Sequence, residues 1–130
     1  VEALFYGFRA FIARPDALLA EQGLSRVHHR ILYFVGRNPG QSVNDLLAIL
    51  NVTKQSLNGP LRQLQELGLI QAEADEQDRR VKRLSLTESG QALEAALSGD
   101  QRQRLARVFA SLGPEDEAAW RRVMAKLAEE

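Results

Sequence analysis

The segment from Ser42 to Thr87 combines two helical patterns and two β-prone runs in a fixed order. The helical patterns come first and are separated by a short turn at Asn51-Val52, and the β-prone runs follow with a polar, charged tip between them. Helix, turn, helix and β-hairpin in this order predict a winged helix-turn-helix, a module that reads DNA.

Residues with known capping preferences mark the ends of both predicted helices. Ser42 followed by Asp45 resembles a capping box, which begins the first helix. Asn51 tolerates the left-handed conformation that ends a helix, and Thr53 is an N-cap for the second helix. Gly68 stands where the second helix is expected to end, since glycine adopts a positive φ without strain.

Apolar side chains recur at helical spacing within both predicted helices. The buried stripes are expected to consist of Leu46, Ile49 and Leu50 in the first helix and of Leu57, Leu61 and Leu64 in the second. The strands of the hairpin are predicted over Ile70 to Ala74 and Val81 to Leu86, with a wing tip from Asp75 to Arg80 between them.

Three short motifs resemble the MarR (multiple antibiotic resistance regulator) family of transcription factors. They are Leu67-Gly68-Leu69-Ile70 at the end of the second helix, Asp78-Arg79-Arg80 in the wing, and Leu84-Ser85-Leu86-Thr87-Glu88-Ser89-Gly90 after it. The resemblance extends from Phe5 to the C-terminus. It implies a mainly α fold with a small β-hairpin wing, in which helices at both ends of the chain form a dimer.

The outward face of the second helix carries the first set of candidate DNA contacts. Glutamine and asparagine side chains pair with adenine, and arginine binds guanine or phosphate, so Gln55, Asn58 and Arg62 are candidates for contacts to base edges. Lys54 and Ser56 are candidates for phosphate contacts. Pro60 within this helix removes one backbone hydrogen bond and is expected to kink or shorten it. We hypothesise that Gly59 then lets the backbone approach DNA closely.

The wing carries the second set of candidate DNA contacts. Four of the five residues from Arg79 to Arg83 are basic. The resemblance implies that Arg80 enters the minor groove and that Asp78 orients it, which agrees with the negative potential of a narrow groove and with charge-assisted hydrogen bonding. Arg79, Lys82 and Arg83 are expected to support Arg80 through phosphate contacts or local packing.

Apolar helices are predicted on both sides of the DNA-binding lobe, which spans residues 24–90. The N-terminal helix, over residues 1–14, is expected to end at Pro15-Asp16, and residues 91–130 follow the N-cap Thr87 and include a new helix start at Pro114. Their apolar stripes are Leu4, Phe5, Phe8, Phe11 and Ile12 at one end and Trp120, Val123, Met124 and Leu127 at the other. These faces predict a two-fold dimer with two recognition helices about one DNA turn apart.

Two adjacent histidines, His28 and His29, lie in the predicted helix that follows Ser25. Neighbouring residues point about 100° apart on a helix, so they do not form a metal pair. We expect both rings to be exposed or at the edge of the core. The resemblance, however, implies a ligand pocket between this helix, the first helix and the wing-to-tail junction.

Composition limits the remaining possibilities. A chain of 130 residues predicts a single domain over 1–130, and the absence of cysteine excludes disulfides and thiol redox sensing. No apolar run reaches membrane-spanning length and no signal-peptide pattern is present, which favours a cytoplasmic protein. Because the chain begins at Val1 rather than Met, we expect that a few residues precede it.

The leading interpretation is a homodimeric repressor that binds double-stranded DNA at a pseudo-palindromic operator; the resemblance adds relief by a small molecule. The alternative is a winged-helix protein-interaction module with weak or lost DNA binding. Zero net charge and Gly59-Pro60 favour the alternative, whereas Asp78 and Arg80 argue against it. An enzyme or a cofactor is not expected, because no nucleophile–base pair, phosphate-binding glycine loop or metal-ligand spacing is present.

Overall fold

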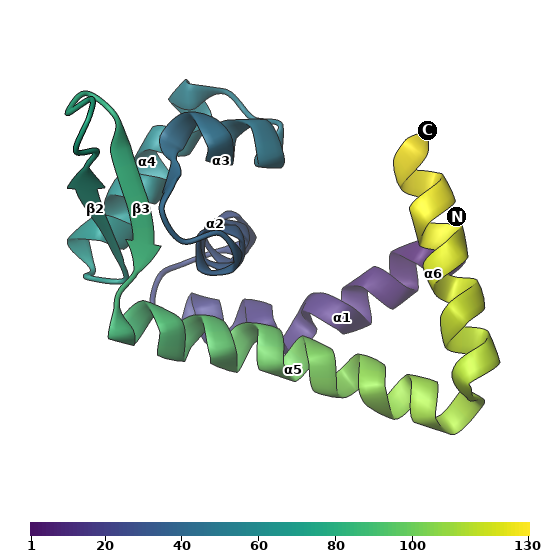
Figure 1. Cartoon of the computed structure of the whole chain (residues 1–130). Coiled ribbons are helices and arrows are strands. Elements are labelled where there is room, and N and C mark those ends of the chain that lie inside the picture. The colour runs from purple at the N-terminus through teal and green to yellow at the C-terminus, as the bar shows by residue number, and fades with distance from the viewer.

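The computed structural model describes residues 1–130 and contains six helices and a three-stranded antiparallel sheet (Figure 1). In chain order the elements are α1 (Glu2–Ala20), α2 (Arg26–Arg37), β1 (Gln41–Ser42), α3 (Val43–Leu50), α4 (Lys54–Glu66), β2 (Ile70–Ala74), β3 (Lys82–Leu86), α5 (Glu88–Leu112) and α6 (Pro114–Glu129). The predicted order of helix, turn, helix and β-hairpin is therefore confirmed.

The predicted helix boundaries in the lobe are held by side-chain caps. The Ser42 hydroxyl accepts a hydrogen bond from the Asp45 N–H at 3.1 Å, and the Asp45 carboxylate accepts one from the Ser42 N–H at 3.0 Å. Asn51 ends α3 with a left-handed φ of 53°. Thr53 caps α4 by accepting a hydrogen bond from the Ser56 N–H at 3.1 Å. These contacts satisfy backbone groups that a helix end leaves without partners.

The core of the lobe is formed where α2, α3, α4 and the sheet meet. The predicted stripe of α4, consisting of Leu57, Leu61 and Leu64, is buried. In α3 the prediction was wrong for Ile49, which is 43% exposed. The buried face is centred between Leu46 and Leu47, so Ile49 falls at its edge.

The sheet has one strand more than the predicted hairpin. Its strand order is β1-β3-β2, and β1 pairs with β3 through Gln41 and Leu84. A strand of two residues has no alternating pattern that a sequence can display. In the hairpin, Ile70 pairs with Leu86 and Ala74 with Lys82, so β3 begins one residue later than predicted.

The start of α5 packs closely against the start of β2. Thr87 caps α5 by accepting a hydrogen bond from the Gly90 N–H at 3.0 Å, and its own hydroxyl donates to the Gly68 carbonyl at 2.6 Å. The Thr87 N–H donates to the Leu69 carbonyl at 3.1 Å. A Cβ atom at Gly90 would overlap with that same Leu69 carbonyl oxygen, so this junction requires glycine.

The first helix is longer than predicted. We expected α1 to end at Pro15-Asp16, but it continues to Ala20 with Pro15 inside it. Proline removes one hydrogen bond from a helix interior. Here Pro15 and Leu19 are fully buried, and burial of this last turn stabilises it by more than the lost bond costs.

Outside the lobe, α5 runs beneath it, α1 lies along α5, and α6 leads away from the far end of α5 (Figure 1). No residue of α6 is buried, and Trp120, Val123 and Leu127 are 38%, 61% and 53% exposed. The Phe109 and Trp120 rings pack 5.3 Å apart and join α6 to α5. None of the helices has the length and apolar character needed to cross a membrane.

Candidate nucleic-acid interface

The rotation of α4 about its axis is fixed by its buried leucines, and this sets which residues face outward. All of the residues predicted to contact DNA from this helix are exposed, and they are Lys54, Gln55, Ser56, Asn58 and Arg62. The Ser56 hydroxyl donates to the Thr53 carbonyl at 3.0 Å, so its side chain also strengthens the start of the helix. The helix therefore presents amide, hydroxyl and basic groups together on one surface.

The proline within α4 does not shorten the helix. The helix is continuous from Lys54 to Glu66 with Pro60 inside it, so the expected shortening was wrong. Leu57, Leu61 and Leu64 anchor both sides of the proline in the core, which compensates for one missing backbone hydrogen bond. A Cβ atom at the exposed Gly59 would meet nothing within 4 Å, so the backbone is open to a large partner at this point.

The tip of the wing holds an exposed guanidinium group in a defined orientation. Arg80 donates to both oxygens of the Asp78 carboxylate, from Nε and Nη2, each at 3.1 Å. The Arg80 side chain is nevertheless 91% exposed. The hydrogen bonds from Arg80 lower the pKa of the Asp78 carboxyl and raise the pKa of the guanidinium. The pair is therefore fully charged at neutral pH and free to meet an anion.

A second carboxylate, Asp75, supports the tip from below. It accepts hydrogen bonds from the N–H groups of Gln77 and Asp78 at 3.1 and 3.0 Å and from Nε of Arg83 at 3.1 Å. The backbone bond from Asp78, followed by the bond from Arg83, lowers the pKa of Asp75. Phosphate contacts and local packing were the two roles predicted for Arg83, and its bond to Asp75 fits local packing. Arg79 and Lys82 are exposed and form no ion pair.

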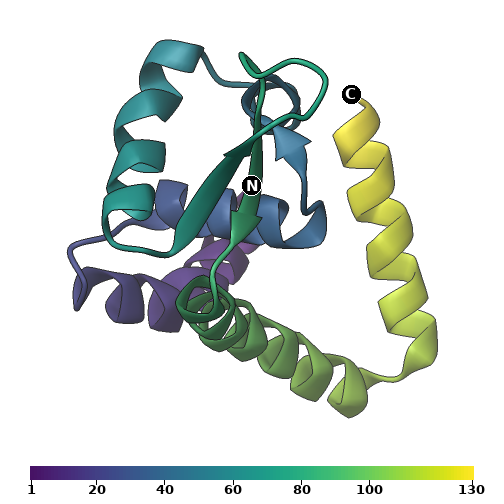
Figure 2. The ribbon, with the colours of Figure 1, turned by 60° about the vertical axis from the view of Figure 1, so that its left-hand side comes forward.

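The two sets of candidate contacts lie on one side of the lobe. The beginning of α4 and the tip between β2 and β3 both lie away from α5, as Figure 2 shows. The predicted site residues of the wing (Asp78, Arg79, Arg80 and Lys82) thus share a side of the molecule with those of α4. This side presents basic and amide groups, and no group of His, Asp and Glu residues in the structure is placed to hold a metal ion.

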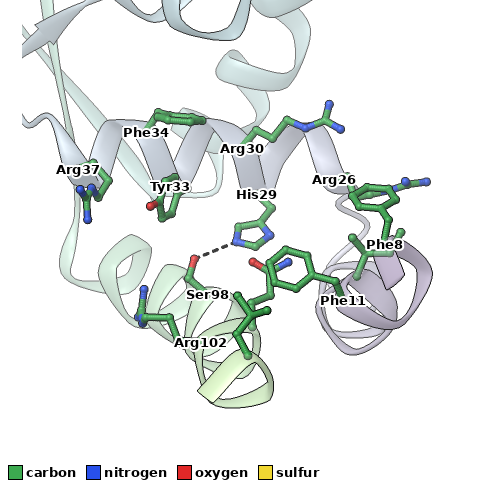
Figure 3. A pocket seen from close by; sticks show the side chains of 13 residues that line it. Phe8, Phe11, Arg26, His29, Arg30, Tyr33, Phe34, Arg37, Ser98 and Arg102 are labelled. Atoms are coloured by element: carbon green, nitrogen blue, oxygen red, sulfur yellow. Dashed lines mark hydrogen bonds between the residues drawn. The ribbon is translucent and has the colours of Figure 1, made fainter. Parts of the chain in front are cut away.

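A pocket of about 430 Å³ lies between α1, α2 and α5, away from this surface (Figure 3). Its walls combine aromatic rings with guanidinium groups. The lining includes Phe8 and Phe11 from α1, Arg30, Tyr33 and Arg37 from α2, and Arg102 from α5. The sequence contains the aromatic spacing in α1, but it gives no sign that arginines from two other helices line the same pocket.

The adjacent histidines are more deeply buried than expected. His28 is 6% exposed and His29 is 9% exposed, and both rings are hydrogen-bonded. Of the two expected positions, exposed or at the edge of the core, the exposed one was therefore wrong. Nε2 of His28 lies 2.9 Å from Oε1 of Gln63 on α4, and Nε2 of His29 lies 3.0 Å from the hydroxyl of Ser98 on α5. Figure 3 shows the His29 ring between α2 and α5, at the wall of the pocket.

The burial of His29 gives the protein a predictable response to acid. Burial lowers the pKa of His29 below 6.5, against the raising effects of Glu94 and Asp16. As the pH falls below 6.5, the unfolded chain therefore binds a proton before the folded chain does, and the free energy of unfolding decreases. The slope is at most about 1.4 kcal/mol per pH unit for this one proton.

Urea unfolding from about pH 7.5 to pH 5 measures this effect. We expect His29→Gln, which keeps a polar group beside Ser98 but does not titrate, to lose this part of the slope. The lowered pKa values of Asp75 and Asp78 act below 3.8, outside this range. An identical slope in the parent and the variant would show that His29 does not contribute.

Comparisons with known proteins agree with this arrangement. The family model described as MarR family matches residues 22–81. The HTH-type transcriptional regulator PetP of Rhodobacter capsulatus is 41% identical, over 95% of this chain and 75% of that protein. An HTH-type transcriptional repressor of Mycobacterium bovis is 30% identical, over 89% of this chain and 85% of that protein.

Among solved structures, that of Streptococcus pneumoniae FabT in complex with DNA matches with a TM-score of 0.87 and 21% identity. The match covers 98% of this chain and 92% of that chain. At this level of identity the match establishes the fold.

Proposed function

Because this chain belongs to the MarR family, we propose that it regulates transcription by binding double-stranded DNA as a homodimer. The observation that carries the proposal is the wing tip, where Asp78 holds an almost fully exposed Arg80 by two hydrogen bonds. A pre-oriented guanidinium loses little freedom when it enters a narrow minor groove, whose negative potential attracts it. The exposed polar face of α4 on the same side of the lobe supports the proposal.

Each set of candidate residues has a proposed role on the DNA. Gln55, Asn58 and Arg62 contact base edges in the major groove, because their amide and guanidinium groups match base donors and acceptors. The phosphate contacts are assigned to Lys54, Ser56, Arg79 and Lys82. Gly59 lies between the residues that read bases, and its open backbone lets α4 sit deeply in the groove.

Homodimer formation is proposed from the apolar surfaces outside the lobe of residues 24–90. Leu4 and Phe5 in α1 are each 55% exposed, and the apolar stripe of α6 is uncovered in the single chain. A two-fold arrangement of these helices buries both surfaces and places two copies of α4 about 34 Å apart. Such a dimer binds a pseudo-palindromic operator.

We further propose that the protein is a repressor and that a small molecule in the pocket of Figure 3 weakens its DNA binding. The pocket is lined by aromatic rings and by arginines, so it favours a small anion that carries an aromatic ring. A ligand there contacts α1, α2 and α5 and shifts the population away from the state that fits DNA. A regulator that acts on DNA in this way is expected to work in the cytoplasm.

Selection of bound fragments from a random DNA pool tests the proposed function. We expect enrichment of an inverted repeat whose half-sites are one helical turn apart, together with a dimer mass in solution. Binding should weaken steeply with salt, because basic side chains displace counterions from phosphates. A folded protein that enriches no sequence would contradict the proposal and favour the protein-interaction alternative.

A further inference from the structure

The first turn of α2 contacts three other helices. Nε of Arg26 lies 3.5 Å from the Asp16 carboxylate of α1, and its guanidinium carbon lies 5.8 Å from the centre of the Phe8 ring. His28 reaches Gln63 of α4, and His29 reaches Ser98 of α5. Neighbouring helical residues point about 100° apart. One turn of α2 therefore contacts both the wall of the pocket and α4, the recognition helix that carries the candidate base contacts.

The hydrogen bonds of His28 define the tautomer of its neutral ring and the orientation of that ring. Nδ1 lies 3.0 Å from the Ser25 backbone N–H, which can only donate, so Nδ1 carries no hydrogen. The neutral ring therefore carries its hydrogen on Nε2 and donates it to Oε1 of Gln63 at 2.9 Å. Because Ser25 is the N-cap of α2, the same ring links the start of α2 to α4.

Gln63 is placed to control the position of α4. It follows the candidate base contact Arg62, and its bond to His28 is the only side-chain hydrogen bond that joins α4 to another helix. The other contacts of α4 with the core are apolar, through Leu57, Leu61 and Leu64. Apolar packing tolerates small sliding movements, whereas a hydrogen bond has a defined direction and length.

We propose that the His28–Gln63 hydrogen bond is a positioning contact that transmits the state of the pocket beside His29 to the recognition helix. A molecule in the pocket, or loss of the His29–Ser98 bond, moves the first turn of α2. His28 moves with it, and α4 changes its position at Gln63. This inference rests on the proposed function, since the output of the movement is DNA affinity.

A double-mutant cycle tests the coupling without any ligand. Ser98→Ala removes the hydroxyl that His29 contacts at 3.0 Å, and Gln63→Leu removes the acceptor of His28. With DNA selected by the parent protein, we expect each single variant to bind about five-fold more weakly. In the Gln63→Leu background, Ser98→Ala should have an effect of less than about two-fold, because the connection is already broken. Equal effects of Ser98→Ala in both backgrounds would overturn the proposal.

Further variants separate positioning from general stability. Gln65→Leu makes the same chemical change at an exposed position of α4 and should leave both affinity and coupling unchanged. Gln63→Glu keeps an acceptor for His28 and should restore the coupling that Gln63→Leu removes. Thermal unfolding of every variant confirms that it is folded.

Nitrogen NMR of His28 gives a readout that does not depend on DNA. A protected Nε2–H signal should be present in the parent and in Gln65→Leu but absent in Gln63→Leu. Absence of that signal in the parent would also overturn the proposal. If the parent shows the signal but binds no DNA, the proposed function fails while the contact itself stands. If the parent binds DNA but the effects of Ser98→Ala and Gln63→Leu on DNA affinity are additive, only the coupling fails.

Discussion

Arg80→Ala is expected to weaken binding to the selected operator by about 30-fold, which corresponds to about 2 kcal/mol. The side chain is 91% exposed and its guanidinium is held by two bonds to Asp78, so the variant removes a pre-oriented charge without disturbing the core. A minor-groove contact reads groove width, so discrimination between the operator and unrelated DNA should fall as well. Fluorescence anisotropy with both DNAs at several salt concentrations measures these changes.

The neighbouring Arg79 provides a matched control, because it is exposed and forms no ion pair with a carboxylate. Arg79→Ala should weaken binding to operator and unrelated DNA alike and reduce the salt slope by about one. Asp78→Asn should have an intermediate effect, since Arg80 keeps its charge but loses one of the two hydrogen bonds that orient it. Identical profiles for Arg79→Ala and Arg80→Ala would show that Arg80 contacts only phosphate.

Gly90→Ala is expected to lower the free energy of unfolding by about 3 kcal/mol and the melting temperature by about 10 °C. The added methyl group would overlap with the Leu69 backbone carbonyl, which cannot rotate away as a flexible side chain can. Relief would require α5 to move off the lobe, and this would also strain the Thr87 bonds to Gly68 and Leu69. Urea and thermal unfolding at fixed protein concentration measure the loss.

Gly99→Ala is the control in the same helix. A Cβ atom there meets nothing within 4 Å, and alanine is the better helix former, so this variant should gain about 0.5–1 kcal/mol. Opposite changes in the free energy of unfolding at Gly90 and Gly99 would distinguish the effect of close packing from that of helix propensity. Similar stability of Gly90→Ala and the parent would show that the junction between α5 and β2 is more adaptable than its geometry indicates.

Local signals in the sequence were sufficient for most of the lobe. The caps at Ser42, Thr53 and Thr87 and the left-handed Asn51 act through neighbours in sequence, and the structure confirms them. The leucines of α4 pack against distant elements, but their helical spacing is visible within the segment itself, and their burial is confirmed. The Asp78–Arg80 pair is equally local, because only Arg79 lies between its members in the chain.

The features that the sequence did not reveal depend on contacts between distant segments. Pro15 remains within α1 because Leu19 reaches the core of the lobe, which no pattern in the helix records. The strand β1 exists only through its pairing with β3. His28 and His29 were expected to be exposed or at the edge of the core, because the sequence does not show that Gln63 and Ser98, far along the chain, are their partners.

The length of α5 has a mechanical consequence for the protein. With 25 residues, this helix extends about 37 Å from the lobe to the turn that begins α6. Treated as a rigid lever pivoting at the α6 end, α5 converts a tilt of about 5° into a movement of about 3 Å at the lobe. Neighbouring base pairs are separated by about 3.4 Å. Such a rotation is small enough to leave every contact within the lobe intact. It nevertheless displaces one lobe by about one base pair along the DNA, so the two lobes of a dimer no longer match the spacing of the two half-sites.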